Sequence, residues 1–197
     1  MSVPTRIAAA VTGVGLLGLS MWFHTVLPEL RSHVTDPIRT TGATAEEVVN
    51  PVFSLKVERV DVARSLKTSS SLLARPDIGT DGVFVIVHLR VKSNTEPFRL
   101  QSLRLETPGG YRYGSADRIG LSDVVASSYE PLIWEDAVLT FEIPPRRLAG
   151  ARLVIGEFRL LKQLSAETAV DLGIDKAEAA RLARTAPEGH QIRRSGS

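Results

Sequence analysis

The stretch GVFVIVHLRVKSN, residues 82–94, carries the strongest structural signal in the chain. One set of alternate positions is apolar throughout, and the other changes from apolar to charged. The first set is Val83, Val85, Val87, Leu89 and Val91, and the second is Phe84, Ile86, His88, Arg90 and Lys92. A period of two is typical of a β-strand. The partly apolar second face predicts a central strand of a β-sandwich that emerges from beneath a neighbour.

Further alternating segments lie on both sides of this strand. VFSLKVERVDVA, residues 52–63, alternates and then shifts phase, which predicts a β-bulge near Glu58 and Arg59. PFRLQSLRLETPGGYRY, residues 97–113, predicts a hairpin that turns at residues 107–110. Two more strands are predicted, in EDAVLTFEIP (135–144) and ARLVIGEF (151–158). Because no helical pattern separates these strands, the sequence predicts an all-β antiparallel sandwich over residues 52–160.

Residues 161–186 are expected to form a C-terminal extension in which VDLGI, residues 170–174, could pair as an edge strand. Asp175 is followed three positions later by Glu178, which predicts a capped helix from Lys176 to about Arg184. The polar composition of residues 187–197 predicts a disordered tail, and LKTSSSLLARPDIGTDG, residues 66–82, predicts a long surface loop.

Residues 6–30, RIAAAVTGVGLLGLSMWFHTVLPEL, contain no acid and no lysine between Arg6 and Glu29. As a helix, residues 7–27 are long enough to cross a hydrocarbon layer about 30 Å thick, and apolar residues occupy every face. The sequence therefore predicts a transmembrane helix over residues 7–27. The alternatives are a cleaved secretory signal and a core helix. WFHTVLP, residues 22–28, lacks the small residues that a cleavage site needs.

We expect residues 1–6 to lie in the cytoplasm, residues 28–51 to form a stalk or a first edge strand, and the body to lie outside. The predicted location is the cell membrane, with a single pass and an extracytoplasmic C-terminal domain. The charge bias behind this orientation is weak, because Arg6 on the inner side is opposed by Arg31 and His33 beyond the helix.

The bulk composition limits the possible classes of function. A length of 197 residues suits one folded domain with an anchor and tails. The net charge of +2, from 24 basic and 22 acidic residues, gives no large field of one sign, so we expect no nucleic-acid partner. The chain has no cysteine, which excludes disulfides, thiolate nucleophiles, iron–sulfur clusters and a lipidated cysteine.

Three of these segments together resemble a known bacterial family. They are residues 82–94, the LRLETPGGYRY turn, and the strand that contains Val138, Phe141, Glu142, Ile143 and Pro144. Over about residues 37–158 they resemble membrane-anchored extracellular immunoglobulin-like domains of unknown function. The resemblance implies an immunoglobulin-like sandwich and an envelope location, with no activity common to the family. This chain lacks the more Gly- and Asp-rich turn and the lipidated cysteine that are frequent in that family.

No constellation of residues predicts catalysis. His24, His33, His88 and His190 are scattered without metal-ligand spacing, and we interpret His88 as a strand histidine satisfied by a neighbour. No serine lies in a glycine-flanked nucleophile elbow. The acids of the later loops lack the spacing of a calcium site; they are Asp117, Asp123, Glu130, Glu135 and Asp136. We therefore expect no enzyme activity, no cofactor and no metal.

The segment GLSDVVASSYEPLIWED, residues 120–136, contains the candidate interaction surface. Its apolar residues stand beside acids, as in the rim of a contact surface; they are Tyr129, Leu132, Ile133 and Trp134. The alternative interpretation is that Trp134 closes the end of the sandwich. The pairs Arg146–Arg147 and Arg193–Arg194 could contact anionic lipid or phosphate, or be solvated turn residues.

We therefore expect a single-pass, membrane-anchored binding or scaffold protein, an accessory or assembly subunit of a bacterial cell-envelope membrane complex. Its partners would be the membrane, through the N-terminal anchor, and another envelope membrane protein. The alternative is an envelope glycan- or lipid-binding module.

Overall fold

The computed structural model describes residues 12–23, 37–67, 77–116, 125–157 and 165–191. The chain divides into two compact units. One contains residues 1–37 and 161–164, and the other contains residues 38–160 and 165–197.

The described part of the first unit is a helix over residues 12–23. Large apolar side chains are exposed around its whole circumference; they are Val14, Leu16, Leu17, Leu19, Met21, Trp22 and Phe23. The predicted transmembrane helix over residues 7–27 is not supported, since no helix in the described part of the chain is both long and apolar enough to cross a bilayer. Residues 7–11 and 24–27 of that prediction lie outside the described residues.

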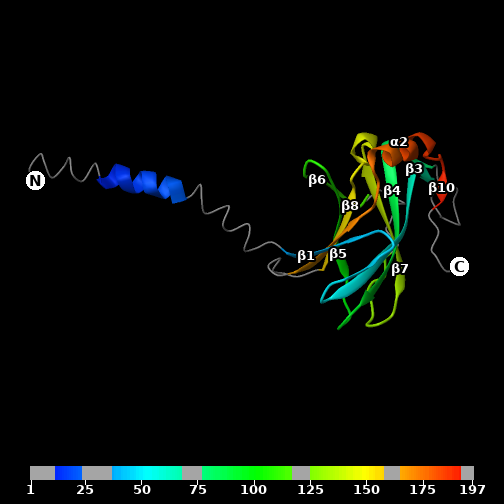
Figure 1. Cartoon of the computed structure of the whole chain (residues 1–197), viewed down its shortest axis with the longest axis horizontal. Helices are drawn as coiled ribbons and strands as arrows, with labels where there is room; N and C mark the ends of the chain where they lie inside the picture. Colours follow the sequence, from blue (N-terminus) through cyan, green and yellow to red (C-terminus); the bar gives the residue numbers. More distant parts are fainter. Residues whose placement is uncertain (1–11, 24–36, 68–76, 117–124, 158–164, 192–197) are drawn as a thin grey trace, which may run out of the picture. The chain divides into compact units, whose positions relative to one another are not determined.

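The second unit is a β-sandwich (Figure 1). Its elements are β1 (Ile38–Ala43), β2 (Glu47–Val49), β3 (Phe53–Lys67), β4 (Ile78–Ser93), β5 (Leu100–Thr107), β6 (Tyr111–Gly114), β7 (Glu135–Ile143), the 3₁₀ helix η1 (Pro145–Arg147), β8 (Arg152–Glu157), β9 (Ala166–Asp171), α2 (Lys176–Thr185) and β10 (His190–Gln191). The first sheet, called sheet A below, has the strand order β1-β9-β8-β5-β6. The second, sheet B, has the order β10-β3-β4-β7, with β2 also paired to β3.

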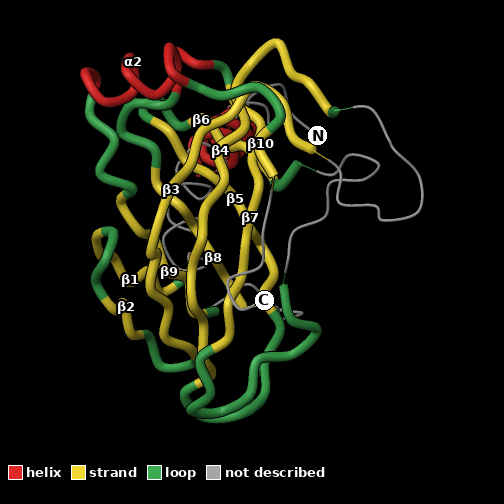
Figure 2. The backbone as a smooth tube through the Cα atoms, turned by 90° about the vertical axis from the view of Figure 1, so that its right-hand side faces the viewer, coloured by secondary structure: helices red, strands yellow, loops and turns green. Residues whose placement is uncertain are grey.

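Strand β4 is central, as its sequence predicts. It lies between β3 and β7, and β3 and β4 run side by side along the sandwich (Figure 2). Residues 83–89 are all buried, so both faces of the strand are covered. One face enters the main core between the sheets, where Val85 and Val87 lie in a cluster with Leu105 and Leu153 of sheet A. The other face, with Phe84, belongs to a smaller cluster on the outer side of sheet B.

The local signals in the strand sequences are largely confirmed. The register of β3 against β4 shifts between Val57 and Arg59, where the change of phase predicts a bulge. Strands β5 and β6 form the predicted hairpin, and its turn contains Gly109 and Gly110, with φ of +89° and +77°. Both angles lie in the left-handed region that glycine adopts without strain. The predicted loop over residues 66–82 is shorter than expected, because β3 continues to Lys67 and β4 begins at Ile78.

The sandwich extends beyond residues 52–160 at both ends. Strands β1 and β2 belong to it, so the edge-strand alternative for residues 28–51 applies to residues 38–43. Strand β9 lies inside sheet A, between β1 and β8, although residues 161–186 were expected to be an extension. Two pairs are parallel in the otherwise antiparallel sandwich, namely β1 with β9 and β10 with β3. Residues 190–191 of the predicted disordered tail thus form β10.

The C-terminal helix is confirmed as α2, over Lys176–Thr185. The backbone N–H of Glu178 donates a hydrogen bond to Asp175 Oδ1 over 2.8 Å, so Asp175 caps the first turn as its position predicts. The Glu178 carboxylate pairs with Arg181, three residues further along the helix. Only the Asp175 half of a capping box is therefore formed.

Two isoleucines allow a matched test of the core. Ile143 is buried in the main core, whereas Ile38 on β1 is 56% exposed. We expect Ile143→Ala to lower the free energy of unfolding by about 2–5 kcal/mol, because it removes buried methyl groups and leaves a cavity. Ile38→Ala should change it by less than about 1 kcal/mol. Denaturant unfolding checks both values, and similar losses for the two variants would contradict this description of the core.

Candidate functional site

The outer face of sheet A carries a row of charged residues in direct register across four strands. From β9 to β6 the row reads Asp171, Arg152, Glu106 and Arg112, with alternating charge. Side chains alternate between the two faces of a strand, and residues next to these four in sequence lie in the core. The four charged side chains therefore point away from the core. At the neighbouring edge, Arg39 of β1 pairs in register with Glu167 of β9.

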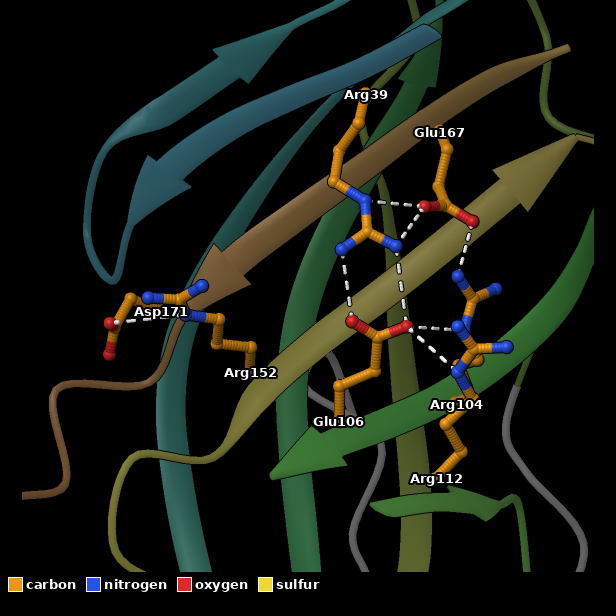
Figure 3. A network of polar contacts seen from close by, with 7 residues as sticks. All are labelled: Arg39, Arg104, Glu106, Arg112, Arg152, Glu167 and Asp171. Carbon is orange, nitrogen blue, oxygen red and sulfur yellow. Dashed lines mark hydrogen bonds and ion pairs between the residues drawn. The ribbon is translucent and has the colours of Figure 1, made fainter. Parts of the chain in front are cut away.

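Four of the charged side chains on this face close a ring of ion pairs, called the Arg–Glu ring below. In order around the ring they are Arg39, Glu167, Arg104 and Glu106 (Figure 3). Arg39 donates from Nε to Glu167 Oε1 over 2.7 Å and from Nη1 to Glu106 Oε2 over 2.9 Å. Arg104 donates from Nε to Glu106 Oε1 over 2.9 Å and from Nη2 to Glu167 Oε2. Each charge thus has two partners of opposite sign within the ring, and Glu106 has a third outside it, Arg112 at 3.5 Å. The ring joins β1, β9 and β5 across β8.

The residues in register between the ends of the ring are small or apolar. Val154 of β8 pairs with Arg104 on one side and with Ala169 on the other, and both Val154 and Ala169 are buried although neither belongs to the main core. Arginine stems cover such surface well, because their methylene groups pack on it while the guanidinium stays at the polar level. The charged side chains of the ring therefore cover the apolar surface in the middle of sheet A.

Hydrogen bonds within the ring favour the ionised form of Glu106. Partial burial opposes the ionisation of Glu106, but hydrogen bonds from Arg39 and Arg104 outweigh that effect and lower the pKa of Glu106 below its ordinary value. The Glu167 side chain is only 5% exposed. A carboxylate so deeply placed is tolerated because both guanidinium groups hydrogen-bond to it.

Two open grooves lie on the outer face of sheet A, and the first of them reaches Glu106 of the Arg–Glu ring. The first, called the hairpin groove, has a volume of about 420 Å³ and is lined by Glu106, Thr107, Pro108, Gly109, Gly110, Arg112, Gly150, Arg152 and Asp171. The second has a volume of about 380 Å³ and is lined by Thr41, Gly42, Ala43, Glu46, Arg152, Ala169 and Asp171. Arg152 and Asp171 line both grooves, which places the two side by side on the same face.

The structure separates the four residues of the predicted interaction surface. Leu132 and Ile133 are exposed, at 78% and 57%, and Leu132 has a φ of +64°. Trp134 is half-buried, with its ring centroid 4.5 Å from Lys92 Nζ and 5.7 Å from the Arg90 guanidinium carbon. Both distances suit cation–π contacts, so Trp134 lies against cations of β4.

Tyr129 does not lie on this surface, contrary to the sequence prediction. It is fully buried, and its ring lies 5.6 Å from that of Phe98, which in turn stacks on Phe53 at 5.0 Å. The Tyr129 hydroxyl accepts a hydrogen bond from the Ala126 N–H over 3.2 Å, and burial raises the pKa of Tyr129. Tyr129 is buried because its ring packs with two other aromatic rings, which come from distant parts of the chain. Tyr129 anchors the segment from which Leu132 and Ile133 project.

His88 is satisfied by neighbours, as its interpretation as a strand histidine requires. Its Nε2 lies 3.1 Å from Asp61 Oδ2 and 3.1 Å from Arg59 Nη2, and His190 Nε2 lies 3.9 Å from the same Asp61 oxygen. Burial and the nearby Arg59 charge lower the pKa of His88, against the opposing effect of Asp61. Within the described ranges, no group of three or more His, Cys, Asp or Glu side chains is arranged to hold a metal ion.

The remaining candidate residues take separate places. The Arg147 guanidinium carbon lies 3.6 Å from the centroid of the Tyr111 ring, beside the β5–β6 turn. Glu130, Glu135 and Asp136 flank Leu132 and Ile133 in sequence. Several candidates fall outside the described residues; they are His24, His33, Asp117, Asp123, Arg193 and Arg194.

Comparisons with known proteins assign neither a family nor a function to this chain. No family model matches the chain, and no curated protein sequence matches it. One similar solved structure is an uncharacterized β-sandwich protein from Clostridium difficile 630, with a TM-score of 0.41, 10% identity, and coverage of 68% of this chain and 95% of that one. Another is the secreted protein MPT63 from Mycobacterium tuberculosis, with a TM-score of 0.42, 12% identity, and coverage of 68% and 97%. The chain contains a β-sandwich domain, while membership of the membrane-anchored immunoglobulin-like family is not supported.

The Arg–Glu ring predicts a measurable difference between two glutamates. Glu167→Gln removes a nearly buried charge and leaves two guanidinium groups short of a partner. We expect it to lower the free energy of unfolding by about 2–3 kcal/mol, less than for a fully buried pair because Arg39 is 35% exposed. Glu178→Gln, which breaks only the exposed pair with Arg181, should leave stability unchanged. Equal stability of Glu167→Gln and the wild type in denaturant unfolding would show that the ring contributes nothing.

Proposed function

We propose that this chain is a membrane-anchored binding module whose sandwich docks on another protein, as an accessory or assembly subunit of a cell-envelope membrane complex. The observation that carries the proposal is the exposure of the consecutive residues Leu132 and Ile133, just before β7 begins at Glu135. Two adjacent large apolar side chains in water are a cost to a free domain, and a partner that covers them removes that cost.

The tip formed by Leu132 and Ile133 is positioned by contacts on both sides of it. The Leu132 N–H donates a hydrogen bond to the Ser93 carbonyl over 3.1 Å, and Tyr129 is locked in its aromatic stack three residues earlier. On the other side, Trp134 lies against Lys92. A backbone positioned in advance by such contacts loses less conformational entropy on binding, which favours a specific contact.

The charges beside the tip indicate the chemistry of the partner. Glu130 and Asp136 are exposed and Glu135 is half-buried, while Lys92 and Arg90 are already engaged with Trp134 and with the carboxylates of Glu47 and Asp136. An anionic bilayer surface would be repelled by this rim. A protein with an apolar pocket bordered by lysine or arginine complements it.

The N-terminal segment supports the anchoring part of the proposal. Apolar side chains are exposed on all sides of the helix over residues 12–23, and the apolar sequence continues from Ile7 to Leu27. Lipid solvates such a helix, whereas water does not. An anchor would also raise the concentration of the sandwich near membrane proteins.

An envelope glycan- or lipid-binding module is the second candidate function. The two grooves on the outer face of sheet A favour its glycan form, because they are open to solvent and have both charged and apolar lining.

Anchoring predicts that the full-length chain behaves as an integral membrane protein. After alkaline carbonate washing of membranes we expect the full chain in the pellet, because an apolar helix in lipid is not released by loss of ionic contacts. A variant that lacks residues 7–27 should be recovered in the soluble fraction. Release of the full-length chain by the wash would refute the anchor.

Docking through the tip predicts different behaviour of two isoleucines with nearly equal exposure, Ile133 at 57% and Ile38 at 56%. In-cell crosslinking followed by purification in mild detergent should recover the same crosslinked species with the wild type and with Ile38→Ser. Ile133→Ser should reduce its yield about tenfold, because a buried aliphatic contact is worth about 1.5 kcal/mol or more. An unchanged yield with Ile133→Ser would rule out docking through this tip.

A further inference from the structure

The hairpin groove has an excess of free hydrogen-bond donors. Its lining contains two arginines and two carboxylates, but Glu106 already accepts hydrogen bonds from Arg39 and Arg104 within the Arg–Glu ring. Arg112 Nε lies 3.5 Å from Glu106 Oε1, and Arg152 Nε lies 3.6 Å from Asp171 Oδ2. Both distances exceed the normal range for an N–H to oxygen hydrogen bond. Among the described residues neither guanidinium group has a closer acceptor, so most of their donors are available to a ligand in the groove.

The net charge around the groove is positive. The Arg–Glu ring is balanced within itself, so its members add no net field. The remaining described charges at the groove and its turn are Arg112, Arg147 and Arg152 against the single acid Asp171. Arg112 and Arg152 are well exposed, at 69% and 58%, and stand on opposite sides of Glu106 (Figure 3). Guanidinium forks bind the paired oxygens of a carboxylate or phosphate group.

The groove is large enough for a ligand bigger than a single ion. Its volume of about 420 Å³ is open to solvent, and the second groove continues past Arg152 and Asp171. At Gly110 no atom lies within 4 Å of the position that a Cβ would take, so a ligand can approach the backbone of the turn. Asp171 Oδ1 accepts from the Gly173 N–H over 2.9 Å, and its carboxylate can accept further hydrogen bonds. Acceptors beside donors suit hydroxyl groups, which both donate and accept.

We propose that the hairpin groove binds an acidic saccharide unit. The carboxylate or phosphate of the sugar is held between Arg112 and Arg152, and its hydroxyl groups bond to Asp171 and to the backbone at Gly109 and Gly110. The second groove receives the next sugar of a chain. The Arg–Glu ring keeps Glu106 fixed and neutralised, which leaves both arginines to the ligand. This site is separate from the Leu132–Ile133 tip and does not depend on docking there.

The proposal is tested by calorimetric titration of the full-length protein in mild detergent. The probes are trigalacturonate for a carboxylate source, glucose 6-phosphate for a phosphate source, maltotriose as a neutral saccharide, and inorganic phosphate. We expect one or both acidic saccharides to bind at least about tenfold more tightly than maltotriose and inorganic phosphate, since each charge-assisted hydrogen bond is strong enough to change affinity by that factor. The acid that binds identifies the source of the anionic group.

Two variants link the binding to the groove. Arg112→Gln and Arg152→Gln should each weaken the acidic saccharide about tenfold, whereas Arg181→Gln, which alters an arginine of equal exposure on α2, should leave its affinity unchanged. Binding of the neutral saccharide with equal affinity, or insensitivity to both groove variants, overturns the proposal. Inorganic phosphate that binds as well as glucose 6-phosphate overturns the saccharide part and leaves an anion site. Absence of binding by all four probes overturns it entirely.

Discussion

The burial of β4 on both of its faces is the constraint from which the rest of the sandwich follows. A strand that carries Val85 and Val87 on one side and Phe84 and Ile86 on the other cannot leave either side in water. Pairing with β3 and β7 satisfies its backbone but covers neither face. One face is closed by sheet A across the main core, and the other by the smaller outer cluster of sheet B. Burial of the first face therefore requires the second layer, and side chains of β3 and β7 pack with those of β4 on the other face.

The outer face of sheet A differs from that of sheet B in being covered by charged side chains. Among the described residues, that face has no apolar cluster comparable with the outer cluster of sheet B. Val154 and Ala169 are covered by charged side chains instead. The Arg–Glu ring fastens the short edge strand β1, which contributes little apolar area of its own, to β9 and β5. A balanced ring has a further effect, because it removes the local field of its members. Charges outside the ring, such as Arg112 and Arg152, then determine what the face attracts.

Sequence reasoning succeeded where the signal was local. The alternation over residues 82–94, the bulge near Glu58 and the Asp175 cap each depend on neighbours within a few positions. The Arg–Glu ring was missed because its members come from strands that are 63 to 128 residues apart in sequence, and ion pairing produces no periodic pattern. The available hint was that Arg104 and Glu106 lie on the same face of one strand. Tyr129 was assigned to the surface because an aromatic beside acids looks alike whether it is exposed or stacked on a distant ring.

The two candidate surfaces differ in the kind of partner that they can accept. At the tip, Leu132 and Ile133 project between carboxylates, so hydrophobic burial supplies affinity and the acidic rim selects a basic partner. In the hairpin groove, the exposed guanidinium groups of Arg112 and Arg152 favour an acid, and charged hydrogen bonds would supply the affinity. Opposite charge preferences make it unfavourable for one ligand to compete for both places. If both proposals hold, a single sandwich would bind a protein and an acidic saccharide at the same time.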